Sequence, residues 1–232
     1  RRLAEALEGR AVLRSDVRVP QHATVDLSGE IVDSVVARGK HLLMRIGPSV
    51  VHSHLKMEGA WHVHPIGTRW RRPGHQARVV LRTATHEAVG FDLGILELTA
   101  SPEADLSHLG PDLLAADWEP AEAIRRIETR PDEPVGTALL DQRLMAGVGN
   151  VYRSEICFLR RVLPTRPVRD VEVPAMVDLS RRLLWTNRLR TARTTTGRTA
   201  PHARLWVYGR RGRLCRRCNS PIERDQLGSI GE

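Results

Sequence analysis

Apolar residues alternate with polar ones in short runs through the first half of the chain. Turn signals separate the runs, among them Gly47-Pro48-Ser49 and the Gly-, Arg- and Pro-rich loop 67–74. A period of two is the pattern of strands with one buried face, and this spacing predicts a β-sandwich or barrel rather than a parallel sheet. The predicted strand segments are EIVDSVVARG, KHLLMRI, SVVHSHL, AWHVH, ARVVLRT and EAVGFDL.

The pattern changes between Pro102 and Pro111. Beyond this point apolar residues recur three and four positions apart, which is the spacing of amphipathic helices. A further helix is expected at the very start, RRLAEALEGR, with Gly9 as its C-cap. The predicted helices of the second half are EPAEAIRRIETR, TALLDQRLMAG, NVYRSEICFLRR and VPAMVDLSRRLLWTNRLR.

Together these patterns predict an α+β protein with three parts. An N-terminal β-sandwich with its flanking helix covers residues 1–115, a helical domain covers 116–200, and residues 201–232 form a small module with hairpin character. The chain does not begin with Met and opens in the middle of a helical pattern, so we expect its true start to lie upstream.

The composition is that of an ordinary globular protein, with 41% hydrophobic and 27% charged residues in a chain of 232. No run of about 18 apolar residues predicts a membrane span, and no signal peptide is recognisable. The three cysteines, two of them in the sequence CRRC, are too few for a disulfide framework. We therefore expect a reducing cytoplasm as the compartment.

The positive charge is concentrated in one segment. The net charge is +9, yet Arg181–Arg217 alone holds twelve arginines and no Asp or Glu, so the rest of the chain is net acidic. A solvated basic tail would have this charge, but Trp185, Trp206 and Tyr208 lie within the segment and indicate a folded unit. We therefore expect a polyanion-binding surface, with nucleic acid as the partner.

Lys40 and Lys56 are the only lysines among 36 basic residues. A lysine ammonium is a compact charge that can lose its proton, form a Schiff base or reach a single phosphate oxygen, which arginine does less well. Both lysines fall at glycine-flanked strand ends. Two ordinary surface lysines remain the alternative to a site.

Two H-x-H pairs, His52/His54 and His62/His64, lie on segments expected to be adjacent strands. Alternation puts each pair on one face, where imidazoles can bind zinc or copper. No carboxylate follows at a spacing typical of a metal site, and half-exposed strand histidines are common. We therefore interpret the four histidines as ordinary strand residues rather than as a metal site.

The sequence AGVGN carries a sharper signal. Gly147 and Gly149 allow a tight turn, and Asn150 is expected to be the N-cap of the helix that follows. Such a turn presents backbone N–H groups at the positive end of a helix, where a phosphate can bind. A corner that only packs is the alternative, but the arginine segment favours the phosphate.

Cys215 and Cys218 form a Cys-x-x-Cys knuckle on a predicted turn, which looks like half of a zinc ribbon. A second pair, which a tetrahedral site normally needs, does not follow in this sequence. Cys157 is expected to be a core residue of the helix that begins at Asn150.

Six ordered segments resemble the bacterial formamidopyrimidine-DNA glycosylase and endonuclease VIII family, and among its members most of all the endonuclease VIII-like branch of actinobacteria. They are RRLAEALEGR, ARGKHLLMRI, HSHLKMEGAW, HLGPDLL, LLDQRLMAGVGNVYRSEICF and VYGRRGRLCRRCNSPI. The resemblance implies a β-sandwich, a helix-two-turn-helix domain and a C-terminal zinc finger.

The resemblance also implies a chemistry. Such enzymes flip an oxidised base out of DNA, attack C1′ with an N-terminal proline amine, and cut the strand by β- and δ-elimination through a Schiff base. Where the 8-oxoguanine enzymes carry an Arg-Phe wedge, this chain reads GFDLGILEL around Phe91, which favours oxidised pyrimidines. The expected function is a base-excision repair glycosylase with AP lyase activity.

The resemblance assigns roles to single residues. It implies that Lys40 is catalytic, through a phosphate contact and proton transfer during elimination. It implies that Lys56 and Met57 lie on the loop that fills the space of the flipped base, and that Gly149 and Asn150 bind phosphate. Cys215 and Cys218 match the first pair of ligands to a structural zinc ion that four cysteines hold in the family.

Three departures from the family pattern limit the expectation. The Pro-Glu start, the second cysteine pair and the finger arginine do not occur in this sequence, so the chain as given is expected to lack the complete chemistry. The alternatives are a family member that binds damaged DNA without cutting it, and a metalloenzyme built on the H-x-H pairs. The expected partner is damaged double- or single-stranded DNA, bound by a monomer in the bacterial nucleoid.

Overall fold

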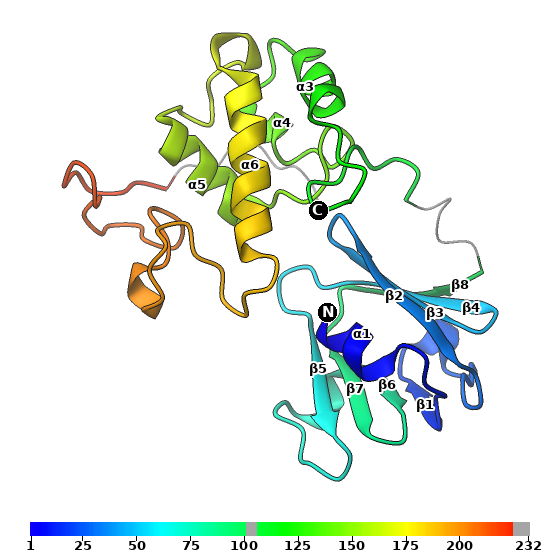
Figure 1. The fold of residues 1–232 in the computed structure, drawn as a ribbon. Helices are drawn as coiled ribbons and strands as arrows, with labels where there is room; N and C mark the ends of the chain where they lie inside the picture. Colours follow the sequence, from blue (N-terminus) through cyan, green and yellow to red (C-terminus); the bar gives the residue numbers. More distant parts are fainter. Residues whose placement is uncertain (101–105, 225–232) are drawn as a thin grey trace. The chain divides into compact units, whose positions relative to one another are not determined.

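The computed structural model describes residues 1–100 and 106–224, which belong to two compact units, Arg1–Ser107 and His108–Glu232 (Figure 1). Within the described residues, the first unit holds the named strands, helix α1 and two short 3-10 turns, and the second unit holds the other named helices. The α+β class predicted from the sequence is confirmed.

The first unit consists of two four-stranded antiparallel sheets. Their strand orders are β1-β6-β7-β5 and β2-β3-β4-β8. Helix α1 (Arg2–Leu7) precedes them; its C-cap is Glu8 and not the predicted Gly9, which follows with a φ of +71° and donates its N–H to the Val32 carbonyl at 2.8 Å. The strands are β1 (Arg14–Val17), β2 (Val32–Arg38), β3 (His41–Ile46), β4 (Ser49–His54), β5 (Ala60–Pro65), β6 (Ala77–Arg82), β7 (His86–Phe91) and β8 (Ile95–Thr99).

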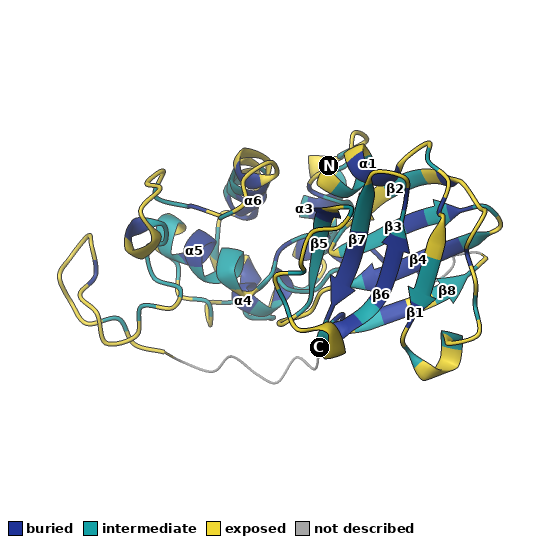
Figure 2. Ribbon diagram, turned by 90° about the horizontal axis from the view of Figure 1, so that it is seen from below, coloured by how far each residue is buried: buried dark blue, intermediate teal, exposed yellow. Residues whose placement is uncertain are grey.

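Alternating residues of the two sheets form one core. Met44 and Val51 of one sheet share a buried cluster with Val79 and Leu81 of the other, and Leu7 of α1 is fully buried among them. Figure 2 shows the long buried stretches of these strands in dark blue. The opposite, outer faces therefore carry the remaining strand residues, among them all four histidines of the H-x-H pairs.

The expectation that the two H-x-H pairs lie on adjacent strands is wrong. His52 and His54 are on β4, which pairs with β3 and β8, whereas His62 and His64 are on β5, which pairs with β7 in the other sheet. The chain changes sheets in the turn between β4 and β5. Four imidazoles therefore cannot converge on one ion.

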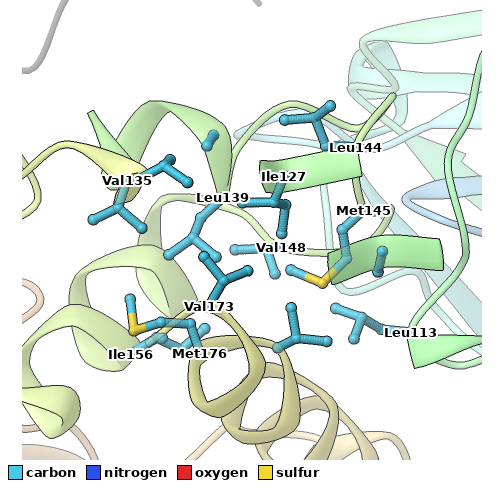
Figure 3. Close-up of a cluster of buried hydrophobic side chains, with 14 of the residues drawn as sticks. Leu113, Ile127, Val135, Leu139, Leu144, Met145, Val148, Ile156, Val173 and Met176 are labelled. Atoms are coloured by element: carbon cyan, nitrogen blue, oxygen red, sulfur yellow. The ribbon is translucent and has the colours of Figure 1, made fainter. Parts of the chain in front are cut away.

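The second unit is built from short helices around a buried cluster, shown in Figure 3. Ile127, Met145, Ile156 and Met176 are among its fully buried side chains. The helices are α3 (Pro120–Glu128), α4 (Val135–Ala138), α5 (Asn150–Arg160) and α6 (Val173–Asn187). The 3-10 turns found in the part of the chain that the structure describes are η1 (Pro20–His22), η2 (Gly74–Gln76), η3 (Val168–Asp170) and η4 (Pro201–Ala203).

The segment TALLDQRLMAG is not the helix that its spacing predicts. Only Val135–Ala138 is helical there, and a series of turns follows. The Asp141 carboxylate accepts from the backbone N–H of Arg143, and the Gln142 side chain binds three backbone groups. Such local bonds compete with helical ones, so the apolar residues are buried by turns instead.

The described part of the 201–232 module has hairpin bonds. Gly212 N–H donates to the carbonyl of Ile222 at 2.8 Å, and Ile222 N–H donates to the carbonyl of Arg213 at 2.9 Å. Leu214 and Pro221 form an isolated antiparallel bridge. The two cysteines lie at the turn between these segments.

Candidate nucleic-acid interface

Lys40 lies at the tip of the two-residue turn between β2 and β3. The register pairs Arg38 with His41, so only Gly39 and Lys40 connect the strands. Gly39 has a φ of +59°, which a two-residue hairpin turn of this kind requires. The lysine side chain is exposed at the end of a rigid hairpin.

Lys56 and Met57 lie on the turn Leu55–Gly59, which connects the two sheets. The Gly59 N–H donates to the Leu55 carbonyl at 2.9 Å, and the Lys56 N–H donates to Nδ1 of His54 at 3.0 Å. These bonds fix a turn from which Met57 projects with 67% of its surface exposed.

Gly94 supports the same turn, which the sequence alone did not indicate. A Cβ at Gly94 would lie 2.5–2.8 Å from the Cβ, Cγ and Cδ of Lys56, so the aliphatic part of the lysine passes directly over the glycine. The Gly94 N–H also donates to the carbonyl of His54 at 3.0 Å. Any larger residue at position 94 would displace Lys56.

The stretch around Phe91 presents no exposed aromatic ring. Phe91 is fully buried, and its ring lies 5.2 Å from that of His62 and 5.8 Å from that of Trp70. Leu93 is also buried. These side chains are part of the packing of the first unit and cannot reach a bound molecule.

Three histidines lie together on the outer face of the β2-β3-β4-β8 sheet. Nδ1 of His41 is 2.8 Å from Nε2 of the buried His52, which is a hydrogen bond, and the His54 ring lies 4.9 Å from that of His41. Nδ1 of His52 is 3.5 Å from the Glu97 carboxylate. Within residues 1–100 and 106–224, no three His, Cys, Asp or Glu side chains are arranged to hold a metal ion.

The side chain of Gln142 stabilises the turn formed by the sequence AGVGN. Gln142 donates to the carbonyls of Leu140 and Val148 at 2.7 and 3.0 Å and accepts from the Gly147 N–H at 2.9 Å. Gly147, at a φ of +120°, faces Leu184 of α6, with only 3.0 Å left for a Cβ. The turn is therefore rigid, and helix α5 begins directly after it.

Asn150 is not the N-cap of α5, contrary to the sequence prediction. The cap is Gly149, and no side chain makes a cap hydrogen bond, while Asn150 is the first helical residue. Glycine is accepted at this position, and its extended φ of −127° and ψ of −179° suit the entry into a helix. The Asn150 side chain is exposed beside the first N–H groups of α5, and it does not cap the helix.

Glu155 joins α5 to the C-terminal segment. Its fully buried carboxylate accepts the backbone N–H groups of Trp206, Val207 and Tyr208 at 2.8, 2.8 and 2.9 Å, and the Thr195 hydroxyl donates to it as well. Arg217 stacks on Phe158 of the same helix at 4.4 Å. These contacts hold the basic segment as a folded unit on α5.

Few carboxylates neutralise the Arg181–Arg217 segment. Among the described residues only Arg182 of this segment forms an ion pair, with Asp178 at 3.1 Å. Burial and the nearby charges of Arg216 and Arg213 lower the pKa of Arg210, whose guanidinium donates to the Trp206 carbonyl. The surface therefore retains an unbalanced positive charge, as polyanion binding requires.

Cys215 and Cys218 lie on one turn, closed by the Asn219 N–H donating to the Cys215 carbonyl at 3.0 Å. Backbone and side-chain hydrogen bonds with Ser220, followed by one with Cys215, lower the pKa of the Cys218 thiol. Cys157 is buried in the core, and burial raises the pKa of its thiol to about 12. Cys215 and Cys218 therefore share one turn, and Cys157, in the helical core, is not part of it.

Comparison with known proteins finds the same two parts. A family profile described as "Formamidopyrimidine-DNA glycosylase N-terminal domain" matches residues 1–93, and one described as "Formamidopyrimidine-DNA glycosylase H2TH domain" matches residues 109–195. No described helix is both long and apolar enough to cross a membrane.

The chain is similar to curated bacterial proteins over almost its whole length. It is 53% identical to "DNA-(apurinic or apyrimidinic site) lyase Nei2" of Mycolicibacterium smegmatis, covering 97% of this chain and 89% of the relative. It is 49% identical to "Endonuclease 8 2" of Mycobacterium tuberculosis, covering 96% and 89%.

Two solved structures share the fold. A complex of MutM with DNA containing carbocyclic 8-oxo-G has a TM-score of 0.78 at 20% identity, covering 97% of this chain and 90% of that one. A complex of Lactococcus lactis Fpg with DNA containing an abasic site has a TM-score of 0.78 at 21% identity, covering 97% and 91%.

Proposed function

The chain belongs to the formamidopyrimidine-DNA glycosylase and endonuclease VIII family of base-excision repair glycosylases and AP lyases, and on this premise we propose that the complete protein removes oxidised pyrimidines from DNA and cuts the strand at the resulting abasic site. The observation that carries the DNA contact is the rigid Gly147–Asn150 turn. It opens α5 with N–H groups that no side chain caps and with an exposed Asn150, beside a segment whose described arginines, except Arg182, form no ion pair.

The reaction needs a secondary amine at the start of the mature protein, as the family resemblance implies. That amine attacks C1′ of the sugar, the glycosidic bond breaks, and the base leaves with its electron pair and takes up a proton. The sugar ring then opens as the C1′–O4′ bond breaks and O4′ takes up a proton, which leaves an iminium at C1′. The iminium makes the C2′ proton acidic; loss of this proton expels the 3′ phosphate, and loss of the C4′ proton then expels the 5′ phosphate. Lys40, on its rigid hairpin, is proposed to bind a phosphate near this sugar and to assist the proton transfers.

The lack of an exposed ring near Phe91 supports a pyrimidine lesion over 8-oxoguanine. Phe91 is buried, so the stretch around it offers no ring to wedge the strand opposite the lesion. The exposed Met57, on a turn fixed by Gly59 and Gly94, is suited to fill the space that a flipped base leaves in the stack.

We also propose that Cys215 and Cys218 are two ligands of a structural zinc ion. Their shared turn, and the lowered pKa of the exposed Cys218 thiol, fit half of a tetrahedral thiolate site. The described residues offer no third donor beside them. The zinc would hold the finger in shape and take no part in the reaction.

Borohydride trapping tests the enzymatic proposal. The iminium between the amine and the sugar is reduced to a stable protein-DNA adduct. The protein with its mature Pro-Glu start should be trapped on a duplex with an abasic site or an oxidised pyrimidine, and the 232-residue chain should not.

Two outcomes would contradict this proposal. If the complete protein binds the damaged duplex but is never trapped, the protein is a lesion-binding member of the family that does not cut DNA. If the 232-residue chain is trapped as efficiently as the complete protein, the nucleophile lies within this chain, and Lys40 and Lys56 are the first amines to replace.

Asn150→Ala is expected to weaken binding to damaged duplex by about tenfold, the value of one good hydrogen bond to a charged group. Because Gly149 and not Asn150 caps α5, the midpoint of thermal unfolding should change little. Fluorescence anisotropy and a melting curve measure the two effects. A large loss of stability with unchanged binding would assign Asn150 a structural role.

A further inference from the structure

The C-terminal half of α6 carries an exposed stack of charged and aromatic side chains. The guanidinium carbon of Arg188 lies 3.8 Å from the ring centre of Trp185, and that of Arg181 lies 4.4 Å from it. Arg181 also lies 5.9 Å from the ring of Trp118. Positions 181, 185 and 188 are four and three residues apart, so they share one face of the helix.

This face is not part of the core. Leu184 and Asn187 of α6 are buried, whereas Trp185 between them keeps 42% of its surface exposed, and α6 as a whole shows exposed and buried sides (Figure 2). An exposed tryptophan contributes little to folding. Tryptophan and arginine together are the residues enriched at the centres of binding surfaces.

The two guanidiniums are held in place but not neutralised. Arg188 donates from Nη1 to the Trp185 carbonyl at 2.7 Å, and Nη1 of Arg181 is buried without a hydrogen-bond partner. Among the described residues neither arginine has a carboxylate within ion-pair distance, whereas Arg125 on α3 is paired with Glu122 at 2.8 Å. Stacking fixes a planar guanidinium and leaves N–H groups for an anion.

Helix α6, which carries the stack, packs against the turn before α5. Leu184, the neighbour of Trp185 in the sequence, is the side chain that meets Gly147 of that turn. Trp118 also packs against the hydrophobic cluster that contains Leu113 and Leu184. A polyanion bound at the turn before α5 therefore has further fixed positive charge available on α6, the helix that packs against this turn.

We propose that Arg181 and Arg188, oriented by Trp185, form a clamp for DNA backbone phosphates next to those held by the Gly147–Asn150 turn. The proposal rests on the proposed function, because it takes DNA as the partner. The clamp has no sequence preference, since phosphate contacts position DNA and do not read it. It lengthens the bound stretch of duplex rather than recognising the lesion.

The salt dependence of binding to undamaged duplex tests the clamp. Each lost phosphate contact lowers the slope of log affinity against log salt by about 0.9, so the complete protein with Arg181→Gln and Arg188→Gln should lose about 1.8 from the slope. Its affinity at low salt should fall at least ~10-fold. Arg125→Gln removes one charge from the same unit and is the matched control, with an unchanged slope.

A second variant tests the orientation of the two arginines while keeping their charge. Trp185→Leu keeps both guanidiniums, so it should retain most of the slope while weakening binding ~2- to 5-fold through loss of the stack. A melting curve for each variant excludes unfolding as the cause. If the double variant keeps the wild-type slope and affinity, the clamp proposal is wrong. An acidic protein is then the expected partner of this face.

The two proposals fail in different ways. Trapping of the complete, unsubstituted protein by borohydride does not depend on this surface. If the complete protein is trapped and the double variant keeps the wild-type salt slope, only the clamp is refuted. A reduced slope in a protein that is never trapped supports the clamp and refutes the lyase.

Discussion

Lys40→Ala in the protein with its mature N-terminus is expected to slow single-turnover cleavage of an abasic duplex by about 100-fold or more, the usual contribution of a positioned proton-transfer group. Lys40 lies exposed at the tip of a two-residue turn fixed by Gly39, so its removal should leave the sandwich intact. DNA binding should weaken much less, by roughly the value of one phosphate contact. Quench-flow cleavage at saturating protein and a separate binding titration give the two numbers.

Lys56→Ala is the matched control for this experiment. It removes the chain's only other lysine, which lies on the turn expected to engage the flipped base, so it should weaken selective binding to the lesion and leave elimination at a preformed abasic site nearly unchanged. If Lys40→Ala loses activity only in proportion to its loss of binding, Lys40 is a phosphate ligand and nothing more.

Glu155→Gln is expected to lower the free energy of unfolding by about 3 kcal/mol, because a buried carboxylate with several donors is replaced by an amide whose own N–H groups face those donors. Three backbone N–H groups and the Thr195 hydroxyl now share its two oxygens. Urea unfolding of the variant measures the loss. Glu128→Gln, an exposed carboxylate on α3, should be neutral.

The same substitution should loosen the basic segment specifically. Amide hydrogen exchange at Trp206, Val207 and Tyr208 is expected to accelerate more than exchange in the hydrophobic core around Ile127. Uniform acceleration throughout the second unit would mean that Glu155 supports α5 itself and does not anchor the segment.

Periodicity predicted most of the fold, and its failures have local causes. The six predicted strands formed where apolar residues alternate, but β1 and β8 were missed because they are short, with four and five residues. The helix expected around Asp141 was replaced by turns because side chains there bind the backbone. At the start of α5, the glycine before Asn150 took the cap position.

The candidate site was predictable only in part. Lys40 and Lys56 are candidates from the sequence because they are the only lysines, and Asn150 is a candidate because it follows a glycine turn. The residues that hold the candidate site in shape were not predicted from the sequence. Contacts such as that between Glu155 and Trp206, which are 51 positions apart, leave no local pattern. Gly94 and Gln142 likewise act on residues that only the folded chain brings to them.

Lys56 has a left-handed backbone, with a φ of +48°, which costs a residue with a side chain on the order of 1 kcal/mol relative to glycine. A chain selected for stability alone would carry glycine there, and Lys56→Gly would relieve the strain while freeing the space above Gly94. On the proposed role of this turn in DNA binding, the strain at Lys56 exchanges stability for function. Thermostabilising changes to this protein are therefore better sought away from the turn 55–59.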